Sequence, residues 1–183
     1  GTTKFNMAIA MCEGEIGTVE AMYFNDTTVW DVLNGGTLTA NGNGGYTLGG
    51  FVSKYAPTII CNWYPGSTTQ TVDRDLQLSV NPNDDGSVWT DAHRLQGVSY
   101  FAIQLEADGE KYAGQLPTVT MLLKGKRILD VSTLTAGDVI GDMTAANYTS
   151  DVDQSPADVL YDYLISDIFG KGRDRDANGN WVA

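Results

Sequence analysis

The sequence predicts an α+β fold that is mainly β, with antiparallel sheets arranged as a barrel or sandwich and one well-defined helix at about 156–168. Three observations predict it. Several segments alternate apolar and polar residues with a period of two, which is typical of half-buried strands. The 183 residues include 21 glycines and only 19% charged residues, which favours strands and turns over a helical bundle. A capped, helically spaced apolar pattern near the C-terminus predicts the helix.

The N-terminal part predicts three strands. The first covers about 4–12, where the alternating apolar residues are Phe5, Met7, Ile9 and Met11. The second covers 19–24 and the third 27–32. The tight Asn25-Asp26 turn between them predicts a hairpin, because both residue types tolerate turn conformations.

The next segments differ in how well they could fill a core. Residues 34–50 are rich in glycine, so we expect an exposed excursion on the surface. The apolar run 56–64 predicts a buried strand, and the alternation of leucine and valine over 76–80 indicates another strand. The segment 96–106 is apolar on both faces, which predicts a strand in the interior of its sheet.

The last elements are a hairpin and the helix. Residues 118–123 and 127–131 are expected to pair about a turn at 124–126. Ser155 can cap the helix, and Pro156 suits its first turn because no N–H partner is needed there. We expect one apolar stripe of the helix to face a core, made of Val159, Leu160, Tyr163 and Leu164.

Charge and hydropathy exclude some function classes. The 11 Lys and Arg residues against 23 Asp and Glu residues give a net charge of −12, which disfavours nucleic-acid binding because phosphate is repelled. No segment has the roughly 18 apolar residues of a membrane-spanning helix. The only basic cluster, residues 124–127, is interpreted as a turn rather than a phosphate cradle.

Few residues could act as nucleophiles or soft metal ligands. Cys12 and Cys61 each lie in a strand-like apolar run, so we expect free, buried, inert thiols. The single His93 is expected to be a hydrogen-bonded surface or boundary residue rather than a catalytic base. One histidine and two separated cysteines also exclude a four-ligand zinc site of the usual type.

Acidic residues and glycines provide weaker candidates. Carboxylate pairs for glycoside hydrolysis could come from Glu13, Glu15, Glu106, Asp108 or Glu110, but chance proximity is the default interpretation in so acidic a chain. The glycine-rich 41–45 segment lacks the context of a phosphate loop, so a flexible loop is favoured.

A polar C-terminal segment matches the first half of a calcium-binding loop. Asp174, Asp176 and Asn178 are the candidate metal ligands, with oxygen donors at positions 1, 3 and 5 and a glycine at position 6. The acidic twelfth position falls beyond Ala183. A metal-free turn is therefore favoured over calcium, and no other cofactor is expected.

Four segments in order resemble a known family. They are Met7–Gly17 with the following strand, Tyr64–Gln70, Gly97–Ala102 with 116–120, and Ser155–Gly172. Together they resemble the central hub, or tip attachment, proteins of long-tailed bacteriophages and gene transfer agents. Glu15 stands where the family usually has proline, and Ser155 where it has asparagine; both serine and asparagine cap helices.

This resemblance implies a structural role without catalytic residues. Such hub proteins form a homotrimeric ring or cone at the tail tip of the virion, which assembles in the host cytoplasm. The ring closes the tail tube and supports receptor-binding or fibre proteins during host attachment and DNA delivery. The implied partners are the distal tail, tail tube and tape-measure proteins, and DNA would pass through the channel without specific binding. The acidic charge would either keep the DNA from adhering or only maintain solubility.

The resemblance also bears on domain organisation. We expect the chain to be a segment of a larger hub polypeptide. Two lobes are expected within it, a β-rich lobe at about 1–130 and a helix-containing lobe at about 131–183.

The principal alternative is a β-rich carbohydrate-binding or adhesin module, stabilised by calcium. Its sugar-stacking surface would come from one of four tryptophans: Trp30, Trp63, Trp89 or Trp181. Packing of these side chains in a core or a subunit interface is the favoured interpretation of them. An enzyme ranks third.

Overall fold

The computed structural model describes residues 3–80, 88–107, 109–112, 115–135, 148–149 and 156–165. The fold is mainly β with antiparallel sheets and a C-terminal helix, so the predicted fold class is confirmed. The chain divides into two compact units, Gly1–Lys124 and Gly125–Ala183. Each unit is described by itself below.

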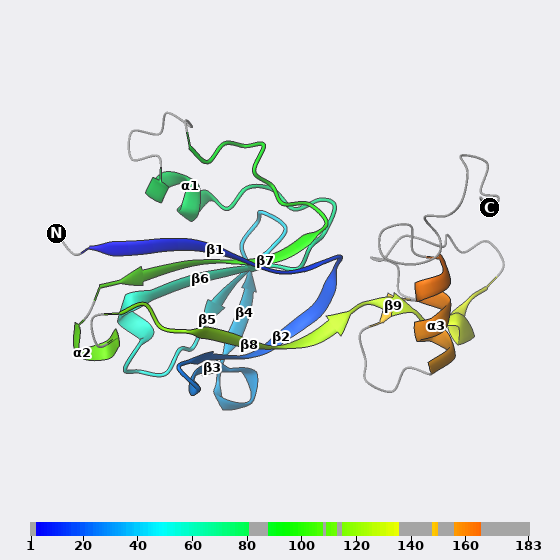
Figure 1. Cartoon of the computed structure of the whole chain (residues 1–183), viewed down its shortest axis with the longest axis horizontal. Helices are drawn as coiled ribbons and strands as arrows, with labels where there is room; N and C mark the ends of the chain where they lie inside the picture. The colour runs from blue at the N-terminus through cyan, green and yellow to red at the C-terminus, as the bar shows by residue number, and fades with distance from the viewer. Residues whose placement is uncertain are drawn as a thin grey trace. The chain divides into compact units, whose positions relative to one another are not determined.

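A five-stranded antiparallel sheet forms the larger part of the first unit (Figure 1). Its strands, in spatial order, are β1 (Lys4–Glu13), β7 (Val98–Glu106), β6 (Ile59–Tyr64), β5 (Tyr46–Gly49) and β4 (Thr37–Ala40). β7 is paired on both sides, with β1 and β6. The prediction that 96–106 is an interior strand is confirmed.

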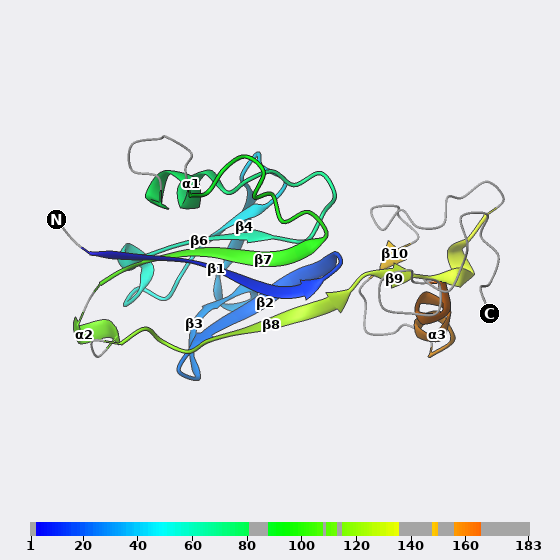
Figure 2. The ribbon, with the colours of Figure 1, turned by 45° about the horizontal axis from the view of Figure 1, so that its top comes forward.

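A three-stranded sheet lies beside it, in the order β3 (Thr27–Asp31), β2 (Ile16–Phe24) and β8 (Val119–Lys126) (Figure 2). β2 and β3 form the predicted hairpin. Asn25 and Asp26 turn the chain with φ angles of 47° and 64°. Short polar residues of this kind adopt left-handed conformations at the lowest cost after glycine.

The main core lies between these two sheets, because its buried side chains come from both. β2 and β3 contribute Val19, Met22, Phe24, Val29 and Trp30, whereas the larger sheet contributes Leu48, Cys61, Trp63, Phe101, Ile103 and Leu105. A smaller cluster covers the opposite face of the larger sheet. There, Leu76 of α1 (Arg74–Val80) packs on Tyr64, Tyr100 and Ala102.

Two predictions within the first unit are wrong. Residues 34–50 are largely exposed, as predicted, but they are not an irregular excursion, because they contain the paired strands β4 and β5 and bury Leu48. Residues 76–80 are not a strand but part of α1. A short alternating run fits either element, and here the capping carboxylate of Asp73, which accepts a hydrogen bond from the backbone N–H of Leu76, starts a helix.

The expected hairpin at 118–131 is also wrong. β8 continues through Gly125 to Lys126, so residues 124–126 are extended rather than a turn. The following β9 (Ile128–Leu129) pairs instead with β10 (Tyr148–Thr149). The boundary between the two units falls within the last residues of β8.

The second unit contains β9, β10 and α3 (Pro156–Ile165). The predicted helix is confirmed over these residues; 166–168 lie outside the described residues. Its predicted burial is wrong. The stripe of Val159, Leu160, Tyr163 and Leu164 is 39–57% exposed. Among its described side chains, the buried ones are Asp158 and Asp162, one turn apart on another face.

The remaining elements are short. They are the 3-10 turns Val32–Asn34, Ala56–Thr58 and Val131–Thr133, and the helix α2 (Gly109–Tyr112). None of the described helices is long and apolar enough to span a membrane.

Candidate functional site

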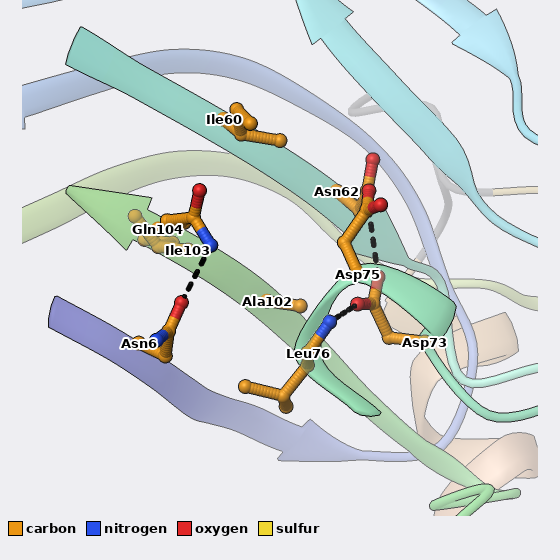
Figure 3. Close-up of a pocket in the computed structure, with 9 residues that line it drawn as sticks. All are labelled: Asn6, Ile60, Asn62, Asp73, Asp75, Leu76, Ala102, Ile103 and Gln104. Carbon is orange, nitrogen blue, oxygen red and sulfur yellow. Dashed lines mark hydrogen bonds between the residues drawn. The ribbon is translucent and has the colours of Figure 1, made fainter. Parts of the chain in front are cut away.

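A small pocket opens on the larger sheet beside the start of α1 (Figure 3). Its lining residues come from β1, β6, β7 and α1 together with the residue before it, and they are Asn6, Ile60, Asn62, Asp73, Asp75, Leu76, Ala102, Ile103 and Gln104. Its free volume of about 10 Å³ is close to that needed by one water molecule. The pocket therefore has little room for a ligand larger than a water molecule.

Asp73 is the fully buried carboxylate of the pocket. One oxygen, Oδ1, accepts from the backbone N–H of Leu76 at 2.6 Å. The other, Oδ2, accepts from Asn62 Nδ2 at 2.8 Å and from the Tyr64 hydroxyl at 3.0 Å. Three donors on one carboxylate offset the cost of burying it.

Asn62 joins Asp73 to a second carboxylate. Its Nδ2 also donates to Asp75 Oδ2 at 3.0 Å, while its Oδ1 accepts from the Thr47 hydroxyl at 2.7 Å. One amide therefore separates two acidic side chains and links β6 to both α1 and β5. This network fixes the position of α1 on the sheet.

Two stacked tyrosines lie beside Asp73. The Tyr64 and Tyr100 rings are 4.6 Å apart and almost parallel, as expected for cross-strand partners of β6 and β7. Burial, and secondarily the charge of Asp73, raises the pKa of both phenols above the ordinary range. Both side chains therefore remain neutral hydrogen-bonding groups at physiological pH.

The two hydroxyls differ in their partners. Tyr64 donates to Asp73 and accepts from Asn41 Nδ2 at 3.2 Å. The Tyr100 hydroxyl is buried and makes no hydrogen bond of ordinary geometry, while its contact with the backbone of Asp73 acts to lower its pKa. Its hydroxyl therefore contributes less to stability than that of Tyr64.

The polar groups of the pocket are bonded mainly to one another. Asp73 is occupied by three donors, and the free volume accommodates about one water. Within the described ranges, no group of three or more His, Cys, Asp or Glu residues is placed to hold a metal ion.

A second cluster, here termed the motif junction, comprises Gly14, Pro65, Gly66, Gln70 and Gly97. The N–H of Gly14 donates to the carbonyl of Gly97 at 2.7 Å. The N–H of Ile16 donates to the carbonyl of Pro65 at 2.9 Å. These bonds bring together three chain segments that lie far apart in the sequence.

Gln70 is the side chain that locks the motif junction. It is fully buried, and its Oε1 accepts from the N–H of Gly66 at 3.0 Å. Its Nε2 lies 2.6 Å from the carbonyl of Leu95 and 3.2 Å from that of Val98. A single amide thus ties the 65–70 turn to the entrance of β7.

Gly66 must be glycine for two reasons. Its φ is +99°, a left-handed conformation that side chains disfavour. A Cβ atom there would lie 2.5 Å from the carbonyl oxygen of Gly14. The close approach of the two glycines therefore fixes the spacing between the β1–β2 corner and the 65–70 turn.

The two cysteines differ in burial. Both thiols are free, as predicted. Cys61 is completely buried, and burial, with the charge of Asp73, raises its pKa. Cys12 is exposed, so the prediction that it is buried is wrong. Cys12 pairs with Ser99 at the end of β1, the edge strand of its sheet, and the bulge between Ala10 and Cys12 precedes it.

His93 is a hydrogen-bonded boundary residue, as predicted. It is half-buried, its Nδ1 accepts from the N–H of Thr90 at 2.9 Å, and its ring stacks on Trp89 at 4.9 Å. Trp30 and Trp63 are 0% and 2% exposed, so the core interpretation is confirmed for both. Trp181 lies outside the described residues.

The other predicted site residues do not gather at the pocket. Glu13 and Glu106 end antiparallel neighbours, β1 and β7, and therefore lie at opposite ends of that pair. The 41–45 segment is the turn between β4 and β5, in which Asn41 Oδ1 accepts from the N–H groups of Asn43 and Gly45. Asp108 and the candidate calcium ligands Asp174, Asp176 and Asn178 lie outside the described residues.

The carboxylates that do meet, Asp73 and Asp75, were not singled out in the sequence. The signal that could have found them is local. An aspartate three residues before an apolar position is a helix-capping pattern, and it would have placed α1 at Arg74.

No protein-family model matches the chain, and no curated protein matches it.

Proposed function

We propose that this chain is a non-enzymatic structural subunit of a phage or phage-like tail tip. In this proposal it forms part of a homo-oligomeric ring or cone that closes the tail tube, contacts tail tube and tape-measure proteins, and supports receptor-binding parts during host attachment. The proposal rests on the ordered motifs of the sequence, which resemble central hub proteins.

One structural observation supports using those motifs together. Three of the four segments that carry the resemblance meet at the motif junction: the β1–β2 corner with Gly14, the turn with Gly66 and Gln70, and the start of β7 at Gly97. At this junction Gly66 lies too close to Gly14 for any side chain, and the buried Gln70 bonds to backbone groups. Such residues hold the backbone of these motifs in place, which agrees with the structural role that the resemblance implies.

The observed pocket agrees with a structural role. Its space is that of about one water, and its buried carboxylate is engaged by three donors. The polar residues there hold α1 on the sheet instead of presenting reactive atoms to a substrate-sized cleft.

Immunogold electron microscopy of particles from the source of the sequence tests the proposal. Antibodies raised against the folded chain should label one end of each tail, and averaged images of the purified parent assembly should have rotational symmetry. Labelling of heads or tail shafts, or particles that lack the chain altogether, would contradict it.

A glycan array separates this function from the alternative adhesin module. The purified chain should bind no glycan through Trp89, the described tryptophan that is only half-buried. Glycan binding that is abolished by Trp89→Ala but retained by Trp30→Phe, a conservative change in the core, would favour the adhesin module.

A further inference from the structure

The turn between β4 and β5 carries two Asn-Gly pairs that the proposed function does not use. They are Asn41-Gly42 and Asn43-Gly44, and a third described pair, Asn34-Gly35, follows β3. In such a pair the asparagine can deamidate without an enzyme, because glycine has no side chain to shield its backbone nitrogen and few limits on its backbone angles. The three pairs have the same local chemistry, so the fold decides which of them reacts first.

Deamidation requires the asparagine side chain to close a ring with the next residue. The backbone nitrogen of the glycine loses its proton and forms a bond to Cγ of the asparagine. The bond between Cγ and Nδ2 then breaks, and Nδ2 takes up a proton and leaves as ammonia. Water opens the resulting five-membered imide to aspartate or isoaspartate, so the net reaction consumes one water and releases one ammonia. Hydrogen bonds that hold the amide in another direction have to break before the ring can close.

Asn41 is held by three hydrogen bonds to its side chain. Its Oδ1 accepts from the N–H groups of Asn43 and Gly45 at 2.9 and 3.2 Å. Its Nδ2 donates to the hydroxyl of Tyr64 at 3.2 Å, and that hydroxyl is itself fixed by its bond to Asp73. Ring closure at Asn41 would break all three bonds, so we expect the fold to protect this residue most.

Asn34 has one such bond, and its acceptor is a carboxylate. The Nδ2 of Asn34 donates to Asp31 Oδ2 at 2.8 Å, while Asp31 Oδ1 accepts from the N–H of Leu33 at 2.8 Å. Hydrogen bonds to an ionised group are about twice as strong as those between neutral groups. Asn34 is exposed, but this bond has to break before it can react, so we expect intermediate protection.

Asn43 differs because its backbone is held and its side chain is not. Its N–H donates to Asn41 Oδ1, and its carbonyl accepts from the N–H of Thr71 at 2.9 Å and from the Thr71 hydroxyl at 3.3 Å. Among the described residues, none makes a hydrogen bond to the Asn43 amide group, and none accepts from the N–H of Gly44. Neither the attacked amide nor the attacking nitrogen therefore has to give up a hydrogen bond.

We propose that Asn43 is the residue at which the folded chain deamidates spontaneously, ahead of Asn34 and Asn41. Asn41 and Asn43 provide the closest comparison. They lie in one turn, each is followed by glycine, and both are half-buried, so the hydrogen bonds of their side chains are what distinguishes them. This modification goes beyond the proposed function, because it needs no partner subunit.

The product of deamidation would disturb the contact between this turn and the motif junction. Gly44 lies so close to Gln70 that a Cβ atom on the glycine would be 2.7 Å from Cα of Gln70. Isoaspartate lengthens the main chain between residues 43 and 44 by one carbon atom at this contact. The reaction also adds a negative charge to a chain whose net charge is already −12. We therefore expect aged protein to be less stable than freshly prepared protein.

Mass spectrometry of the full chain, aged in mildly alkaline buffer, tests the order of reaction. The tryptic peptide 5–54 contains all three pairs, and its fragmentation locates each conversion. Asn43 should convert about tenfold faster than Asn34 and about 100-fold faster than Asn41, according to the hydrogen bonds that each has to break. In concentrated urea the three rates should agree within about threefold, because unfolding removes those bonds.

Three results would overturn the proposal. One is a folded chain in which Asn34 or Asn41 converts first. Another is a folded chain in which Asn43 stays intact under conditions that convert all three residues in urea. The third is a set of rate ratios that urea leaves unchanged, because the local sequence and not the fold would then determine the order.

A variant at Asp31 tests the cause of the protection. Asp31→Ala removes the acceptor that holds the Asn34 amide, and should raise the rate at Asn34 about tenfold while the rate at Asn43 stays the same. Circular dichroism verifies that the variant is folded. If it is not, the two asparagines of the 41–45 turn in the parent chain still decide the matter. An unchanged rate at Asn34 in the folded variant would contradict protection by hydrogen bonds.

Variants at the asparagines test the consequence for stability. Asn43→Gln prevents formation of the five-membered ring, so this chain should keep its initial urea midpoint during an incubation that lowers the midpoint of the parent. Asn34→Gln is the matched control and should lose stability as the parent does. Asn43→Asp adds the charge without lengthening the main chain, and it separates these two effects of the reaction. An aged Asn43→Gln chain that loses as much stability as the parent would contradict the assignment of this loss to Asn43.

Discussion

Glycine positions define the motif junction at the residue scale. Gly66→Ala should lower the free energy of unfolding by about 3–5 kcal/mol, because its Cβ would meet a backbone oxygen at 2.5 Å as well as a left-handed φ. Gly42→Ala is the matched control. Its φ is +78° and nothing lies within 4 Å of the added Cβ, so it should cost only about 1–2 kcal/mol. Urea unfolding of both variants measures the difference, and equal losses would contradict the close approach.

Removing the hydroxyl groups of the two stacked tyrosines should affect stability differently. Tyr64→Phe removes a donor to Asp73 and an acceptor for Asn41, and should destabilise by about 1–3 kcal/mol. Tyr100→Phe removes a buried hydroxyl that makes no hydrogen bond of ordinary geometry, and should change the unfolding free energy by less than about 1 kcal/mol. Thermal and urea unfolding compare the two variants. A loss in Tyr100→Phe as large as in Tyr64→Phe would indicate that its contact with the Asp73 backbone is a full hydrogen bond.

Burial of the same tyrosines predicts a loss of stability at alkaline pH. The pKa values of Tyr64 and Tyr100 are raised in the folded state by burial and then by Asp73. Above the unfolded-state pKa of about 10, the unfolded chain loses protons that the native chain keeps, so stability falls as pH rises. Cys61, buried likewise, begins this loss near pH 9. Unfolding free energies from pH 7 to 11 should be flat and then decline, with a smaller decline in Tyr100→Phe.

At the scale of elements, α1 and α3 should tolerate truncation of a leucine very differently. Leu76 of α1 is 6% exposed, so Leu76→Ala should cost about 2–4 kcal/mol. Leu160 of α3 is 57% exposed, so Leu160→Ala should change stability by less than about 1 kcal/mol. Differential scanning calorimetry of both variants checks this. A large loss for Leu160→Ala would mean that a partner covers the stripe.

The strands that alternate over a long stretch could be predicted from the sequence, and others could not. β1, β2 and β7 have nine or ten residues and unambiguous periodicity. β4 and β5 were missed because each has only four residues and glycines flank both. They gain stability from pairing with each other and, through β5, with β6, and such tertiary pairing is invisible to local patterns.

Much of the candidate site escaped prediction for a related reason. The positions of Asp73 and Asn62 become meaningful only when α1 lies on β6, eleven residues earlier in the chain. The wrong prediction for the apolar stripe of α3 also arose because tertiary packing cannot be read from local sequence. Its apolar spacing is real, but the buried face in the structure carries Asp158 and Asp162. Periodicity identifies the helix and leaves its contact face to be set by tertiary packing.

At the scale of the whole molecule, the acidic charge acts against self-association. A net charge of −12 opposes association of the chain with itself over most of its surface. Repulsion of this kind keeps copies of the chain apart unless a specific contact outweighs it.

The division into two units predicts that the first folds without the second. Every buried side chain of both hydrophobic clusters precedes residue 124, and β8 is complete at Lys126. A chain ending after Lys126 should therefore keep its unfolding free energy within about 1 kcal/mol of the corresponding transition of the full chain. Hydrogen exchange provides the comparison: amides of β6 and β7 should be equally protected in both. Loss of protection in β7 on truncation would mean that residues after 126 complete the core of the first unit, and the two units would then have to be treated as one cooperative fold.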